Sequence, residues 1–162
     1  DSSEKGNPPK KFKKLFEEAI KEGFLTVAHA GEEGPPEYIW DSLNLLQVKR
    51  IDHGVQCLKD DKLVQKLKEN NIPLTVCPLS NVKLCVFDKL ENHNLKTMLH
   101  KGLRVMVNSD DPAYFGGYLN TNLVETSKAL NLSLDEVKIL IQNSFKSSFL
   151  DEKSKNIWLN KI

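Results

Sequence analysis

The sequence predicts an α/β fold built on parallel strands. Two observations support this prediction: strand-like and helix-like segments alternate, and they do so at the spacing of helical crossovers. Short apolar runs with β-branched residues alternate four times with segments whose apolar residues recur at helical spacing, and further helices follow. Alternation at this spacing is typical of parallel strands joined by helical crossovers. No linker or low-complexity segment divides the 162 residues, a length that suits one domain with a sizeable core.

Two helix–strand units are expected in the first part of the chain. Proline is tolerated in the first turn of a helix, and glycine often ends one. The expected elements are a helix that opens at Pro8–Pro9 and ends at Gly23, a strand at residues 24–28, a helix from Pro36 with Ile39, Trp40, Leu43 and Leu46 on one side, and a very short strand at residues 50–54.

Two further units and the C-terminal helices are expected in the rest of the chain. The expected elements are a helix from Asp60–Asp61, a strand at residues 72–77 closed by residues 78–81, a helix at residues 94–101, a strand at residues 103–107, and helices after Tyr118. Ser133 and Glu136 form a capping-box pattern that opens the last expected helix.

Composition excludes several kinds of protein. The formal net charge is +1 and charges of both signs are mixed, so the sequence lacks the basic footprint of a nucleic-acid-binding protein. Three cysteines without a CxxC spacing argue against a disulfide framework and a cysteine zinc site. They favour a reducing compartment, the cytoplasm or alternatively the nucleus. We see neither an apolar run of transmembrane length nor a signal peptide, and we expect no membrane partner.

Polar side chains follow every expected strand. In a parallel arrangement the carboxyl ends of the strands share one rim. Taken singly, these residues are more typical of turns, helix caps or hydrogen-bonded structural histidines than of an active site. Four strands that deliver polar groups to one rim favour a metal-dependent active site. The residues are His29 and Glu32, His53, Ser80 and Asn81, and Asp110 and Asp111.

His29 and Asp110 are the best candidates for ligands of a catalytic zinc ion, because imidazole and carboxylate suit a hydrolytic zinc site. Such a site usually takes three protein ligands and a water. We expect His93 and His100 to lie on or beside a helix far from the rim, so the missing ligands should come from outside these residues. The polar start at Asp1, without a methionine, also indicates a fragment.

Four motifs resemble, in order and spacing, the C-terminal half of the adenosine/adenine deaminase family. They are His29-Ala-Gly-Glu32, Arg50-Ile-Asp-His53-Gly54, Val76-Cys-Pro-Leu-Ser80-Asn81 and Asn108-Ser-Asp110-Asp111-Pro112. The resemblance runs from Asp1 to at least Asn122. The amino-acid sequence of residues 28–40 and 110–118 is similar to that of the adenine deaminase branch of the family. It implies that residues 1–162 supply strands five to eight and the C-terminal helices of a single (β/α)8 TIM barrel. The N-terminal half of that barrel, which carries a His-x-His motif with two more zinc ligands, would be the partner.

The resemblance also implies the reaction, a zinc-dependent hydrolytic deamination of adenine to hypoxanthine and ammonia in purine salvage. His29 and Asp110 would bind zinc, Glu32 would protonate the purine at N1, His53 would be the base and electrostatic partner of the hydroxide, and Asp111 would hydrogen-bond the purine at N7. Ser80 would orient His53, which is our own inference.

Three alternatives stay open. The substrate can be adenosine, the chain can belong to another barrel metal hydrolase that cleaves an amide or ester, or the half-barrel can be a catalytically incomplete folding or association module. The His-x-Glu and Pro-Cys-x-x-Cys motifs of the cytidine-deaminase type are absent from the sequence, which sets that enzyme class aside. Because half a barrel has two open strand edges and an uncovered inner face, we expect the chain alone to be unstable or self-associating. We also expect it to be inactive unless its N-terminal half is present.

Overall fold

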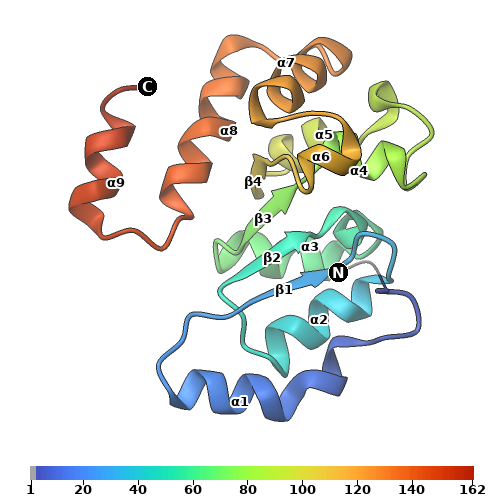
Figure 1. Ribbon diagram of the computed structural model, residues 1–162, viewed down its shortest axis with the longest axis vertical. Coiled ribbons are helices and arrows are strands. Elements are labelled where there is room, and N and C mark those ends of the chain that lie inside the picture. Colours follow the sequence, from blue (N-terminus) through green and yellow to red (C-terminus); the bar gives the residue numbers. More distant parts are fainter. Residues whose placement is uncertain (1–2) are drawn as a thin grey trace.

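A parallel four-stranded sheet lies at the centre of the molecule (Figure 1), whose computed structural model describes residues 3–162. The strands are ordered as in the sequence, and each pairs in parallel with its neighbours. Their bounds are β1 (Val27–Ala30), β2 (Arg50–His53), β3 (Pro73–Val76) and β4 (Arg104–Val107). The predicted parallel α/β fold is confirmed.

Helices precede, connect and follow the strands (Figure 1). Before and between the strands lie η1 (Pro9–Phe12), α1 (Lys13–Lys21), α2 (Pro36–Asn44), η2 (Val55–Lys59), α3 (Asp61–Glu69), α4 (Pro78–Lys83), η3 (Leu90–Asn92) and α5 (Leu95–His100). After β4 come α6 (Pro112–Phe115), α7 (Leu119–Ala129), α8 (Leu134–Lys146) and α9 (Glu152–Leu159). Within residues 3–162, no helix is long and apolar enough to cross a membrane.

Two of the differences from the predicted boundaries bear on the site. The first strand runs from Val27 to Ala30 instead of residues 24–28, so His29 lies within it, and the apolar side chains of Phe24 and Leu25 remain 69% and 56% exposed before it. The segment that closes the third strand forms the short helix α4, with Pro78 at a position where a missing N–H costs nothing. The predicted capping box at Ser133 is present at the start of α8.

The two faces of the sheet differ in chemistry, because successive side chains of a strand point to opposite faces. One face is apolar: Ile51, Leu74 and Val105 lie in register and are fully buried. They form one core with the buried side chains of the helices, which include Ile39, Leu63, Leu67, Leu95 and Met98. The opposite face carries the register-matched row His29, Asp52, Thr75 and Met106, which lines a cavity of about 540 Å³.

Candidate active site

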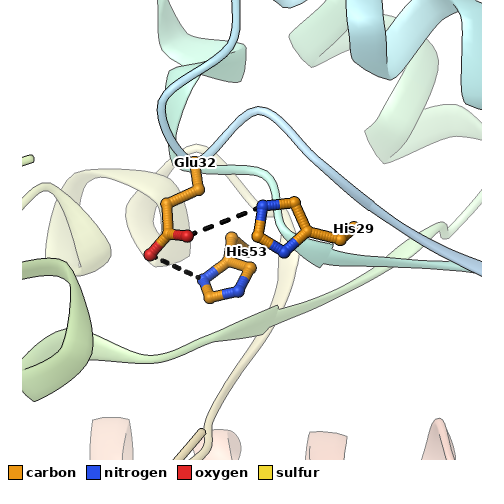
Figure 2. A group of neighbouring side chains, drawn as sticks. All are labelled: His29, Glu32 and His53. Atoms are coloured by element: carbon orange, nitrogen blue, oxygen red, sulfur yellow. Dashed lines mark ion pairs between the residues drawn. The ribbon is translucent and has the colours of Figure 1, made fainter. Parts of the chain in front are cut away.

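Three of the predicted site residues meet where β1 and β2 end. Figure 2 shows the carboxylate of Glu32 beside the neighbouring rings of His29 and His53, with one carboxylate oxygen facing each ring. Glu32 Oε1 lies 3.3 Å from His53 Nδ1, and Glu32 Oε2 lies 3.6 Å from His29 Nε2. The two ring centroids are 4.5 Å apart. His29 comes from β1, His53 from the last position of β2, and Glu32 from the loop that enters α2.

The aspartates that follow β4 reach the same place. Asp110 Oδ2 lies 3.9 Å from His53 Nε2, so His53 stands between Glu32 and Asp110. A cavity of about 400 Å³ is lined by His29, Glu32, His53, Asp110 and Asp111, together with Glu33, Leu84, Tyr114 and Phe115. Five residues from three separate segments of the chain therefore surround one cavity of the size that small-molecule ligands occupy.

Two residues of this rim have a strained backbone. His53 has a φ of 68° and Asp110 a φ of 57°, in the left-handed region that non-glycine residues rarely adopt. Such conformations cost about 1–3 kcal/mol each and cluster at functional sites. The strained backbone indicates that the surrounding fold, and not local preference, sets the side-chain directions of His53 and Asp110.

Ser80 contacts a different partner from the one predicted. Its hydroxyl donates a hydrogen bond of 2.6 Å to Asp110 Oδ2, whereas we predicted that it orients His53. The neighbouring Asn81 lies against His53 instead, with its Nδ2 3.4 Å from His53 Nδ1. Both residues belong to the first turns of α4, the short helix that the sequence did not reveal. In a helical turn, consecutive side chains diverge, so Ser80 and Asn81 reach different groups.

The predicted position of His93 is wrong. His93 is 4% exposed, and its Nε2 lies 3.1 Å from Asn81 Oδ1. Asn81 in turn donates a hydrogen bond of 2.6 Å to Glu32, so His93 is one residue removed from the rim. The connection from β3 to β4 includes η3 before α5 begins. His93 follows η3 directly and lies near the carboxyl ends of the strands, where it contacts Asn81. His100, in contrast, lies at the end of α5 and contacts Glu136 on α8.

Glu4 is a site residue that sequence reasoning missed. Its buried carboxylate accepts hydrogen bonds from four consecutive backbone N–H groups, those of residues 31–34, in the loop that carries Glu32. It also lies 3.4 Å from His29 Nε2. Burial acts to raise the pKa of Glu4, but the nearby His29 and the backbone N–H groups lower it to about 2. Glu4 is therefore ionised at neutral pH, and its carboxylate holds the loop of residues 31–34 in place.

The pKa values of the two central residues shift in opposite directions. Burial, aided by the charges of Asp110 and Glu4, raises the pKa of Glu32 against the lowering influence of His29 and Asn81. Burial, followed by the charge of His29, lowers the pKa of His53 to about 4. The site thus shifts Glu32 toward its neutral acid form and keeps the imidazole of His53 neutral at neutral pH, and opposite shifts of this kind are typical of acid–base sites.

The donor set of the rim suits a divalent metal ion. His29 Nε2 is buried and makes no hydrogen bond of regular geometry among residues 3–162, although carboxylate oxygens of Glu4 and Glu32 lie 3.4 and 3.6 Å from it. Two triplets bring one ligand atom from each member within 4.8 Å of one another: His29, Glu32 and His53, and His53, Cys77 and Asp110. Imidazole, thiolate and carboxylate are all zinc ligands. Cys77 was not a candidate in the sequence, where it resembled a buried apolar side chain.

The fold and the site define an α/β protein of the TIM-barrel amidohydrolase class, whose C-terminal half the parallel sheet and the following helices match. An amidohydrolase from Burkholderia ambifaria, solved with bound Zn, shows this match with a TM-score of 0.89 and 28% identity, over 98% of this chain and 44% of that chain. The family model described as adenosine deaminase matches residues 1–162, and the chain belongs to this family.

Relatives within the family are more similar still. The chain is 60% identical over 155 residues to an adenine deaminase from Hahella chejuensis, which covers 96% of this chain and 46% of the relative. It is 57% identical over 162 residues to one from Acinetobacter baylyi, over 100% of this chain and 49% of the relative. The crystal structure of adenine deaminase from Arthrobacter aurescens matches with a TM-score of 0.97 and 51% identity, over 99% of this chain and 49% of that chain. The chain spans about half the length of the curated relatives it matches.

Proposed function

We propose that residues 1–162 form the C-terminal half of a single barrel domain that catalyses the zinc-dependent hydrolytic deamination of adenine to hypoxanthine and ammonia. The observation that carries this proposal is the convergence of His29, Glu32, His53, Asp110 and Asp111 around one cavity. High identity to proteins named adenine deaminase supports adenine, rather than adenosine, as the substrate. The reaction would serve purine salvage in the cytoplasm.

His29 and Asp110 would hold the zinc ion. The buried His29 Nε2, which makes no hydrogen bond of regular geometry, supports this assignment, as does the hydrogen bond from Ser80 that fixes Asp110. A bound zinc ion would supply hydroxide at neutral pH by lowering the pKa of a water molecule. Two ligands are fewer than a catalytic zinc site needs, so we assign the others to a His-x-His motif in the N-terminal half.

Glu32 is the acid of the reaction. Its raised pKa makes the carboxyl group easier to protonate than an ordinary glutamate, and the protonated acid can donate to purine N1 and make the neighbouring ring carbon electrophilic. His53 is neutral at neutral pH, and its Nε2 faces Asp110 on the proposed metal side. It can therefore take a proton and return it as ammonia leaves. Asp111, on the wall of the cavity, would hydrogen-bond purine N7.

The test uses residues 1–162 fused behind the N-terminal half of the Hahella chejuensis adenine deaminase, here called the joined protein. We expect the joined protein to contain zinc and to release ammonia and hypoxanthine from adenine, with a higher kcat/KM for adenine than for adenosine. The N-terminal half alone and residues 1–162 alone serve as controls and should be inactive. A folded, zinc-containing joined protein that leaves adenine intact, or that prefers adenosine, would overturn the proposal.

A further inference from the structure

Asn81 connects the two groups that we propose to handle protons. Its side chain is fully buried, and its amide nitrogen donates a 2.6 Å hydrogen bond to Glu32 Oε1 and lies 3.4 Å from His53 Nδ1. An amide nitrogen only donates, whereas the amide oxygen only accepts. A rotation of the amide by half a turn would therefore exchange donor and acceptor in front of Glu32 and His53.

His93 decides which way this amide points. Its Nδ1 accepts a 3.0 Å hydrogen bond from the backbone N–H of Leu95, so this nitrogen carries no hydrogen. The proton of the ring then sits on Nε2, which donates to Asn81 Oδ1 over 3.1 Å. Burial lowers the pKa of His93 to about 4, which keeps the ring neutral at neutral pH. The ring itself is held by Phe87, whose centroid is 4.3 Å away.

A rotated amide would impair Glu32 in either protonation state. Facing an ionised Glu32, Asn81 Oδ1 would oppose another acceptor. Facing the neutral acid, Oδ1 would accept its proton and hold it away from the substrate. In the observed orientation the amide N–H of Asn81 donates to Glu32 Oε1. Glu32 Oε2 faces His29, as Figure 2 shows.

We propose that His93 is a positioning residue for the deamination, because it fixes the amide of Asn81 and through it the carboxyl group of Glu32. This inference rests on the proposed function of Glu32. The three side chains come from three separate segments: the loop after β1, helix α4 and the turn before α5. No part of the arrangement requires residues outside 3–162.

The test begins with His93→Phe in the joined protein, a change that keeps an aromatic ring against Phe87 and removes both ring nitrogens. We expect kcat for adenine to fall by about 10–100-fold with KM within about threefold, because a general acid contributes about 10²–10⁴-fold and only its orientation is lost. His93→Gln restores a donor and should recover part of kcat. His100→Phe, at a histidine outside this network, is the matched control and should leave kcat unchanged.

A double-mutant cycle separates positioning from general loosening of the fold. If His93 acts through Asn81, adding His93→Phe to Asn81→Ala should change kcat by less than about twofold, since residues of one network are not additive. Multiplicative losses, or a His93→Phe protein with full kcat, would overturn the inference.

A second measurement covers the case in which His93→Phe does not fold. Nitrogen NMR of the unsubstituted protein should find His93 in the tautomer protonated at Nε2, and the other tautomer or a charged ring would also overturn the inference. An unsubstituted joined protein without adenine deaminase activity is a different outcome, because it rejects the proposed function itself.

Discussion

Glu4→Gln is the most informative single substitution outside the rim. The glutamate carboxylate accepts the N–H groups of residues 31–34 and carries a charge beside His29. Glutamine has nearly the same shape, but it has one accepting oxygen where the carboxylate has two, and no charge. The substitution therefore leaves part of a row of buried N–H groups without partners while the volume of the site is unchanged.

The pKa of Glu4 gives the size of the effect. It is lowered from 4.5 to about 2, and a shift of this size corresponds to about 3 kcal/mol of stability contributed by the charged form. Because the folded-state pKa lies below the unfolded one, this contribution is complete above pH 4.5 and is lost as the pH falls toward about 2. Glu4→Gln should thus cost about 3 kcal/mol at neutral pH.

Urea unfolding of the metal-free joined protein measures this cost without a contribution from zinc binding. The difference between the unsubstituted protein and Glu4→Gln should be constant above pH 4.5 and should shrink below it. Glu33→Gln is the control, because Glu33 pairs with Lys5, which is 72% exposed, and should cost less than about 1 kcal/mol. A cost for Glu4→Gln as small as that of the control, or one independent of pH, would refute the reasoning.

Three further predictions concern the rim and the thiols of the joined protein. Ser80→Ala removes the hydrogen bond to Asp110 and should weaken zinc binding by about 10–100-fold in competition with a chelator, whereas Ser127→Ala on α7 should not. Glu32→Gln should lower kcat for adenine by about 10²–10⁴-fold with zinc content retained; unchanged kcat would contradict its role as the acid. Cys85 should react quickly with a thiol reagent, as peptide mass spectrometry can show, since the other two cysteines of these residues are buried.

The parallel order of the strands was predictable because its causes are local. Glycine and proline mark where helices and strands end, and the strands carry apolar runs that only a covered sheet can bury. The rim followed from the same reasoning, since parallel strands must deliver their carboxyl ends to one side. His29, Glu32, His53, Asp110 and Asp111 then needed no further information to be placed around one cavity.

The supporting residues were not predictable, because their positions depend on turns that carry no periodic pattern. His93 reaches Asn81 only after the chain has passed through α4 and η3, both too short to show helical periodicity. Glu4 meets the Gly31 loop across more than twenty residues of sequence, and nothing in its own segment indicates a buried carboxylate. The positive φ of Asp110 likewise results from tertiary packing rather than from local preference.

The hydrogen bonds to Glu32 and Asp110 distinguish the side chains that residues 3–162 position by themselves from the functions that need other residues. Glu32 is held by Asn81 through its carboxylate and by Glu4 through its backbone, and Asp110 is held by Ser80. Each of these bonds joins two groups within residues 3–162, so the directions of the acid and of one proposed ligand do not depend on another segment. Binding of the metal is different, because the two ligands that we propose, His29 and Asp110, are fewer than a catalytic zinc site takes. In the proposed reaction an N-terminal half would therefore contribute the retention of zinc and closure of the cavity, while the half described here would position the acid that we propose to protonate purine N1.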